Sequence, residues 1–496
     1  MAAVAMVTSR ACTSTMGDEE VRARGVSARE VDEDISPILQ KYMVTGWGEP
    51  LYFHQRQVAN MDARASRRRN VAARYRGSTV LIPNGRERCR SNDTQYRFRP
   101  NSGFVYLVGD GEPGDVLALE WDQASGANAT LYTEPIPLWT GSDVISDRER
   151  GALWARPHIG LAGASARYGV NAADIGSMMG DLQGRPNIVL LRGVDDLLDA
   201  GVDSSAAVSA DLSTCLSDMR LIKDQWEIEE IERACWFTAT AFQRVVDRLG
   251  SFRTERDVEI CFDADARTVG EGPGYPTIVA CGPNATIRHY TRNLSELDPS
   301  QLLLIDGGVE TVEYYTADVT RTLPIGGKFA PGQAAIYDVV FSAHQAAMNV
   351  VKPGVPFRAP HEAAMRALSE GLSKLGILEV SPEEAVRRDR RFYRRYCRHG
   401  TSHMLGIDVH DCADASPGAY RDGVLREGMV LTVEPGAYVQ RHDLLAPELY
   451  RGIGVRIEDD VVVTADGCRV LSGTLPVRRD DVEKWVRGEL RVEGAG

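Results

Sequence analysis

The chain has 496 residues, of which 43% are hydrophobic and 26% charged, so its length and composition predict two globular domains. Its formal net charge of −13 disfavours a surface that binds nucleic acid or anionic membranes. The nine cysteines form no C-x-x-C pair, which disfavours a disulfide framework or thiolate zinc site and favours a reducing, cytoplasmic compartment.

The first half of the chain is expected to form an α/β domain. Residues 1–37 are polar and mixed in charge, which is typical of a flexible leader. Between residues 38 and 220, apolar runs alternate with helical patterns, which indicates a mainly buried sheet with helices. No apolar run reaches the roughly 18 residues of a membrane span. We expect a helix at 57–75 and strands at TVLIP (79–83), FVYLVG (104–109) and NIVLLRG (187–193).

A second domain is predicted over residues 221–485, followed by a charged tail at 486–496. Residues 221–249 contain no Gly or Pro, and their apolar residues share one helical face: Trp226, Ile231, Cys235, Phe242, Val245 and Leu249. Helical patterns also occupy 331–351 and 358–375. Because strands and helices come in blocks, we expect an α+β domain with an antiparallel sheet. The expected strands are 277–282, 301–309, 317–325, 429–439 and 452–464.

Four acidic residues of the second domain stand at strand-like positions. Asp306 follows LLLI, Asp318 lies in TADVTRT, Glu434 follows VLTV, and Glu458 follows GVRI. Burying a carboxylate is costly unless it is paired or bound to a metal, so four such residues indicate a polar site. Asp306 and Asp318 are twelve residues apart, and this even spacing would place both on one face of a regular hairpin.

Histidines gather near these carboxylates in the sequence. HGTSHMLGIDVHD contains His399, His403 and His410, and His289 lies in a separate turn-like segment. One imidazole and four carboxylates would form a shell for two divalent cations that accept oxygen ligands, such as Mn²⁺. Spacing alone does not identify which histidine is the ligand. The remaining histidines are expected to be at the surface or structural: His54, His158, His344, His361 and His442.

The motifs occur in a recognisable order. IDGG…TADVTRT, HGTSHMLGIDVHD, TVEPGAY and GVRIEDD together resemble the aminopeptidase P (Xaa-Pro aminopeptidase) branch of the pita-bread metallopeptidases. RSNDTQYRFRPNSGFVYLVG (90–109) resembles the N-terminal domain of that branch, and LIKDQWEIEEIERA resembles the entry into its catalytic half. The resemblance covers roughly residues 40–485. It implies an α/β N-terminal domain and an α+β pita-bread catalytic domain with a curved antiparallel sheet.

The resemblance also implies a role for each matching residue. Asp318 and Glu458 would bridge the metals, and Glu434 has the position of the base that works on the attacking water. Arg456 would hold Asp306, and Tyr438 would lie beside the site. The histidines around the substrate would be His289, His399 and His410, with His289 and His410 near the scissile carbonyl. The ligands of two divalent metal ions, expected to be Mn²⁺, would be Asp306, Asp318, His403, Glu434 and Glu458.

The activity implied by the resemblance is hydrolysis of the N-terminal Xaa-Pro bond through a metal-bridging hydroxide. The substrate would be a peptide with a free N-terminus and proline at its second position, and a homodimer or homotetramer is typical of the family. Two alternatives stay open: a prolidase acting on Xaa-Pro dipeptides, and a specialised paralogue acting on a peptide-like natural-product intermediate. Arg288, Arg398 and Ala437 differ from the residues usual in relatives and suggest the paralogue. A metal-free member is disfavoured because all five ligand positions hold competent residues.

Overall fold

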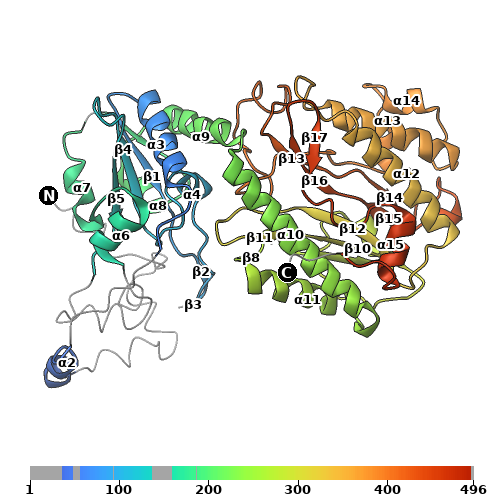
Figure 1. Ribbon diagram of the computed structural model, residues 1–496, viewed down its shortest axis with the longest axis horizontal. Helices are drawn as coiled ribbons and strands as arrows, with labels where there is room; N and C mark the ends of the chain where they lie inside the picture. The colour runs from blue at the N-terminus through green and yellow to red at the C-terminus, as the bar shows by residue number, and fades with distance from the viewer. Residues whose placement is uncertain (1–35, 48–55, 93, 137–158, 186, 493–496) are drawn as a thin grey trace, which may run out of the picture. The chain divides into compact units, whose positions relative to one another are not determined.

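A computed structural model of the chain describes residues 36–47, 56–92, 94–136, 159–185 and 187–492 (Figure 1). The chain divides into two compact units, residues 1–213 and 214–496, and the division falls within α9 (Ala206–Arg220). The predicted leader, 1–37, lies almost entirely outside the described residues, as do His54 and His158. The domain limits 38–220, 221–485 and 486–496 therefore stay predictions.

Unit 1 contains a mixed five-stranded sheet in the order β6-β5-β4-β1-β7. The pairs β1–β4 and β4–β5 are antiparallel, whereas β1–β7 and β5–β6 are parallel. The expected strands at 79–83 and 187–193 are confirmed as β1 and β7. The strands are β1 (Thr79–Pro83), β4 (Val116–Glu120), β5 (Asn128–Thr133), β6 (Asn171–Asp174) and β7 (Ile188–Leu190), with a hairpin of β2 (Cys89–Ser91) and β3 (Thr94–Gln95). The helices are α2 (Pro37–Met43), α3 (Met61–Arg74), α4 (Ser102–Leu107), α6 (Gly160–Tyr168), α7 (Met178–Asp181) and α8 (Asp196–Gly201).

The expected strand FVYLVG is wrong, because these residues belong to α4. The side chain of Asn101 accepts hydrogen bonds from the N–H groups of Gly103 and Phe104 and so caps the first turn. At the other end, the arginines expected in helix 57–75 donate to backbone carbonyls, with Arg68 2.7 Å from Leu107 O. The run is buried on all sides, and an apolar run of this length does not distinguish a buried strand from a short buried helix.

Unit 2 contains short sheets between pairs of helices, and every strand pair described in it is antiparallel. Figure 1 shows its strands between α10 and α11 on one side and α12 and α13 on the other. The helices are α10 (Gln225–Arg248), α11 (Glu255–Val269), α12 (Pro331–Met348), α13 (Ala359–Lys374), α14 (Pro382–Val386) and α15 (Arg479–Val486). The strands are β8 (Gly272–Pro273), β9 (Ile278–Cys281), β10 (Leu302–Gly307), β11 (Val309–Glu310), β12 (Val319–Pro324), β13 (Val430–Val433), β14 (Gly436–Val439), β15 (Ile453–Arg456), β16 (Asp459–Val463) and β17 (Cys468–Val470).

The long helix expected at 221–249 is confirmed as α10, and a capping box sets its start. The carboxylate of Asp224 accepts the N–H of Glu227, whose side chain accepts the N–H of Asp224. Of the predicted core face, Trp226 is half-buried and the other five residues are buried. Among the described helices, none combines the length and apolarity needed to cross a bilayer.

Two of the expected strands of unit 2 are each divided in two. Residues 429–439 form β13 and β14, and residues 452–464 form β15 and β16. β13 pairs with β16 in one sheet and β14 pairs with β15 in another. The breaks fall at Glu434 and Glu458, so each carboxylate stands where the chain passes from one sheet to the next. The divided strands therefore bring these two acidic residues to the same place.

Candidate metal centre

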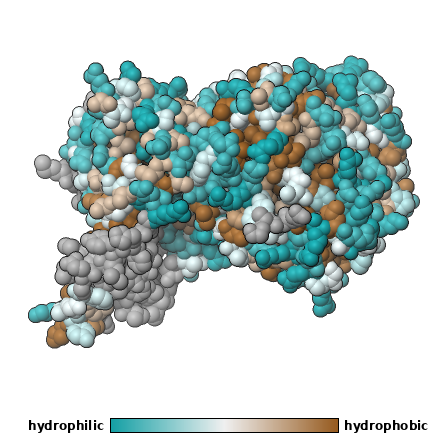
Figure 2. Space-filling view, in the orientation of Figure 1, coloured by the Kyte–Doolittle hydropathy of each residue, from teal (hydrophilic) through white to brown (hydrophobic). Residues whose placement is uncertain are grey.

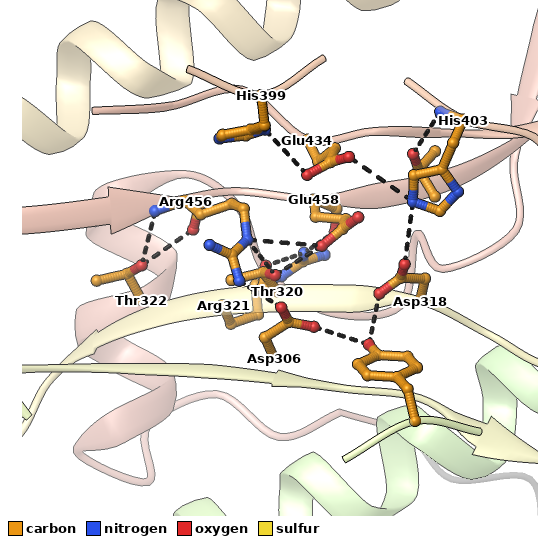
Figure 3. A network of polar contacts seen from close by, with 12 residues as sticks. Asp306, Asp318, Thr320, Arg321, Thr322, His399, His403, Glu434, Arg456 and Glu458 are labelled. Atoms are coloured by element: carbon orange, nitrogen blue, oxygen red, sulfur yellow. Dashed lines mark hydrogen bonds and ion pairs between the residues drawn. The ribbon is translucent and has the colours of Figure 1, made fainter. Parts of the chain in front are cut away.

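Asp306 and Asp318 form one wall of a buried polar site (Figure 3). Asp306 lies in β10 opposite Thr320 of β12, so Asp318, two residues before Thr320, is on the same face. The even spacing in the sequence predicts this arrangement, and the register confirms it. Less than a tenth of either aspartate is exposed to solvent.

Tyr275 joins the two aspartates, and the sequence analysis missed it. Its hydroxyl oxygen lies 2.7 Å from Oδ1 of Asp306 and also contacts Oδ1 of Asp318. Burial, together with the charges of Asp306 and Asp318, raises the pKa of Tyr275 well above its ordinary value, so the side chain remains a phenol that donates. No regular spacing connects Tyr275 to the strand carboxylates, so no local pattern pointed to it.

Arg456 ends β15, and Glu458 lies in the short connection from β15 to β16. The hydroxyl of Thr320 donates to Oε2 of Glu458 at 2.6 Å. The guanidinium of Arg456 donates to Oδ2 of Asp306 and, at 2.9 Å, to the hydroxyl of Thr320. Thr320 is two residues beyond Asp318, so the alternation in TADVTRT was a signal that could have found it.

His403 presents its Nε2 atom to the carboxylates. Its Nδ1 lies 3.1 Å from the carbonyl oxygen of Met404, a contact that requires the proton on Nδ1. In the neutral ring this leaves a lone pair on Nε2, which lies 3.3 Å from Oδ2 of Asp318 and 3.7 Å from Oε1 of Glu434. A backbone carbonyl that fixes the tautomer in this way is typical of metal-binding histidines.

Glu434 and His399 lie together on the other side of the site (Figure 3). Nδ1 of His399 is 3.3 Å from Oε2 of Glu434, and its Nε2 is 2.9 Å from the hydroxyl of Tyr438. Arg456 donates to the same hydroxyl at 2.9 Å. Burial alone would raise the pKa of Glu434. The nearby His399, His403 and Arg456 outweigh burial and lower this pKa to about 2. The pKa of His399 is raised, because Tyr438 and Glu434 outweigh its burial.

The electrostatics of the site favour bound cations. Burial, followed by the charge of Asp306, raises the pKa of Asp318 well above its ordinary value. Burial and the charge of Asp318 likewise raise the pKa of Glu458 well above its ordinary value. Oxygen atoms of Asp318 and Glu458 and a ring nitrogen of His403 lie within 4.8 Å of one another. Such an oxygen-rich set with one imidazole fits divalent cations, which would stabilise the ionised carboxylates.

The remaining predicted histidines lie at the edge of the site. The His410 ring is exposed and stacks edge-on against His403, with centroids 4.4 Å apart. His289 is exposed, and its charge contributes to the lowered pKa of His410 after burial and His403.

His361, predicted to be surface or structural, hydrogen-bonds through Nδ1 to the hydroxyl of Thr401 at 3.0 Å. His344 is buried beside Asp459, and His442 is exposed.

A buried ion-pair cluster supports the loop that carries these histidines. Asp411, next to His410, accepts a hydrogen bond from Nζ of Lys223 at 2.9 Å and lies 3.3 Å from Nη2 of Arg220. The side chains of Lys223 and Asp411 are almost fully buried. Gly406 makes room for the pair, because a Cβ atom there would lie 2.4 Å from Oδ2 of Asp411.

A second buried network lies behind Glu458. The guanidinium of Arg321, which is fully buried, donates to the carbonyl of Glu458 and to Oδ1 of Asp459, both at 2.6 Å. Ser472 donates to the same Asp459 oxygen at 2.6 Å. Because these bonds fix the backbone at Glu458, they orient its carboxylate toward Asp318.

Comparisons with known proteins agree with this geometry. The family model described as "Metallopeptidase family M24" matches residues 229–465, and "Aminopeptidase P, N-terminal domain" matches residues 64–184. Xaa-Pro aminopeptidase 1 of Streptomyces coelicolor is 42% identical over 466 residues, covering 91% of this chain and 92% of that protein. Xaa-Pro aminopeptidase of Escherichia coli is 32% identical over 448 residues, covering 86% and 98%.

Solved structures show the same fold. Aminopeptidase P from E. coli with the inhibitor Pro-Leu superposes with a TM-score of 0.77 at 30% identity, covering 87% of this chain and 99% of that one. A zinc-substituted form of the same enzyme in complex with product gives the same TM-score. The predicted α/β domain followed by an α+β pita-bread domain is thus confirmed. The chain belongs to metallopeptidase family M24 and, within it, to the Xaa-Pro aminopeptidases, which are metal-dependent hydrolases.

Proposed function

We propose that this chain is an aminopeptidase that hydrolyses the N-terminal Xaa-Pro bond of peptides with a free N-terminus. The observation that carries the proposal is the cluster of buried Asp318 and Glu458 with half-buried His403, whose ligand atoms lie within 4.8 Å of one another. The relatives named Xaa-Pro aminopeptidases, matched along nearly their whole length, favour this activity over that of a prolidase or of a specialised paralogue.

Asp318, His403 and Glu458 would hold divalent cations in this cluster, and we expect two ions. When bound, they would offset the carboxylate charge, polarise the scissile carbonyl and lower the pKa of a bound water. The oxygen-rich ligand set favours Mn²⁺, which prefers carboxylate oxygens. The proposed ligands are Asp306, Asp318, His403, Glu434 and Glu458.

Glu434 is the residue that would take a proton from the attacking water. With a pKa of about 2 it is ionised at neutral pH, and His399 holds one of its two oxygens at 3.3 Å. Arg456 donates to the hydroxyl of Tyr438, and this hydroxyl in turn hydrogen-bonds to Nε2 of His399 and fixes its ring. Glu434 is therefore held in one orientation before substrate arrives, as proton transfer requires.

His410 and His289 would face the substrate from the exposed edge of the site. The partial burial of the His410 ring and the nearby His403 lower the pKa of His410, so the ring is neutral at neutral pH. A neutral imidazole can donate its ring N–H to the scissile carbonyl oxygen without bringing a second positive charge beside the cations. His289 would contact the substrate backbone or the same carbonyl.

A cytoplasmic location and a homodimer or homotetramer belong to the same proposal. All eight cysteines in the described part of the chain are free thiols, which supports a reducing compartment. The oligomeric state rests on the family resemblance and would be measured by sedimentation equilibrium.

The test is a peptide panel incubated with the purified full chain, with and without Mn²⁺, and read by mass spectrometry. We expect Mn²⁺-dependent release of the first residue from Xaa-Pro-Yaa-Zaa peptides and slower release from Xaa-Pro dipeptides. Cleavage confined to dipeptides would instead identify a prolidase. Activity that persists after complete removal of divalent metal would contradict the proposal.

A further inference from the structure

An arginine-rich segment, residues 387–398, immediately precedes His399. Seven of its twelve residues are arginine and only Asp389 is acidic, whereas the whole chain has a formal net charge of −13. The segment follows α14 and includes a short 3-10 helix, η5 (Phe392–Arg395). The surface around α14, at the upper right, is largely hydrophilic in Figure 2. Positive charge is therefore concentrated next to the candidate site in an otherwise acidic protein.

Backbone and side-chain contacts hold this segment against the site. The carbonyl of Tyr396 accepts the N–H of Tyr438 at 2.9 Å, and the hydroxyl of Tyr438 hydrogen-bonds to His399. Arg395 donates to both carboxylate oxygens of Asp443, at 2.9 and 2.6 Å. The segment is thus attached at two points and presents its side chains at a defined place beside His399.

Two of the arginines lie close to His361, which borders the site. The buried Tyr393 packs on His361 with ring centroids 6.1 Å apart, and His361 hydrogen-bonds to Thr401. Burial and nearby cations, Arg394 and Arg391 among them, lower the pKa of His361 to about 4. The segment therefore lies against His361 through Tyr393, and the exposed Arg391 and Arg394 stand on either side of that tyrosine in the sequence.

The arginines of the segment fall into two groups. Three form ion pairs: Arg387 with Asp389, Arg390 with Glu384, and Arg395 with Asp443. The other four are exposed and form no ion pair with any carboxylate in the described part of the chain. This second group consists of Arg388, Arg391, Arg394 and Arg398.

We propose that Arg391, Arg394 and Arg398 form a binding surface for acidic residues of the peptide, beyond its proline. The inference rests on the proposed Xaa-Pro aminopeptidase activity. Because the carboxylates at the reacting end are buried, the rest of a peptide must leave through the exposed edge of the site. Guanidinium groups that pair with no carboxylate, in the segment that ends at His399, attract carboxylates over several ångströms and can bind them through two N–H groups.

The test compares three peptides of equal length on the full chain loaded with Mn²⁺: Ala-Pro followed by two glutamates, two alanines or two lysines. We expect kcat/KM to fall in that order, through KM, by about two-fold for each arginine that faces the charges. The differences in kcat/KM between the three peptides should largely disappear in about 0.5 M NaCl, because salt screens contacts between exposed charges. The variant Arg391→Gln/Arg394→Gln/Arg398→Gln should lose the preference while cleaving the alanine peptide normally.

The control variant removes the same net charge elsewhere. It carries Arg244→Gln, Arg469→Gln and Arg491→Gln, which are exposed arginines paired with carboxylates of α10 and α11. This control should keep the preference for the glutamate peptide. Equal cleavage of the three peptides by the wild type would overturn the inference and leave the proposed function standing. A preference that persists in the Arg391/Arg394/Arg398 variant would overturn the assignment to these residues, and no cleavage of any peptide would overturn both proposals.

Discussion

The hydroxyl oxygen of Tyr275 lies 2.7 Å from Oδ1 of Asp306 and also contacts Asp318. A single phenol proton is shared between two aspartates that the β10–β12 register places on one face. Tyr275 therefore orients two of the proposed ligands without being a ligand itself.

Replacement of Tyr275 by Phe should weaken metal binding without unfolding the protein. The ring would still fill its half-buried position, but the aspartates would lose a hydrogen-bond donor that orients them. Loss of such a partner typically lowers metal affinity by about 10- to 100-fold. The measurement is competition with a chelating dye for Mn²⁺. An affinity equal to that of the wild type would show that the hydroxyl has no part in forming the site.

His403 and His410 should behave differently when each is replaced by Ala. Nε2 of His403 lies 3.3 Å from Asp318, so His403→Ala should lower the metal content measured by elemental analysis. His410 is exposed and is proposed to contact substrate, so His410→Ala should keep the metal and lower kcat by about 100-fold or more. Replacement of the exposed His442 is the matched control. Equal loss of metal in both variants would refute this division of roles.

The Lys223–Asp411 pair should be strongly coupled in stability. Asp411→Asn leaves a buried ammonium group without its partner, so it should lower the free energy of unfolding by about 3–5 kcal/mol. The double variant Lys223→Met/Asp411→Asn should recover much of that loss, because it leaves neither the ammonium nor the carboxylate buried without a partner. The part that is not recovered is the lost contact between Asp411 and Arg220. Urea denaturation of the wild type, Lys223→Met, Asp411→Asn and the double variant gives the coupling free energy. Simple additivity of the two single variants would contradict the expected coupling.

The same pair predicts a dependence of stability on pH. Although burial opposes it, Lys223 and Arg220 lower the pKa of Asp411 to about 2, from an ordinary value of 3.8. A lowered pKa contributes stability that is complete above about pH 5 and is lost as the pH falls toward 2. The stability difference between wild type and Asp411→Asn should therefore be constant from pH 7 to 5 and shrink by about 1 kcal/mol at pH 3. If the stability difference between the wild type and Asp411→Asn instead grew on acidification, the pKa of Asp411 would be raised by folding rather than lowered.

Patterns in the sequence were sufficient to predict those elements whose structure depends on the spacing of nearby residues. The alternation around Asp306 and Asp318 predicted their shared face, and the apolar period of residues 221–249 predicted α10. Glu434 and Glu458 were identified because an acidic residue after an apolar run is costly to bury. Their position between two sheets, by contrast, follows from long-range strand pairing, which no local pattern encodes.

The residues that the sequence analysis missed act through tertiary contacts. Tyr275, for example, meets the aspartates from a segment with no strand alternation. The error at FVYLVG has a related cause. The arginines of α3 that bond to the carbonyls of residues 105–107 lie about 40 residues earlier, so the run alone does not reveal its helical state.

The wide separation of the site residues along the chain sets the order of events during synthesis. Asp306 and Glu458 are 152 residues apart, and both sheets must pair before their carboxylates meet. The first unit can fold while the second is still being made, since domains generally fold as units during synthesis. Because Glu458 is one of the proposed ligands, a nascent chain that ends before it should not retain the metal ions.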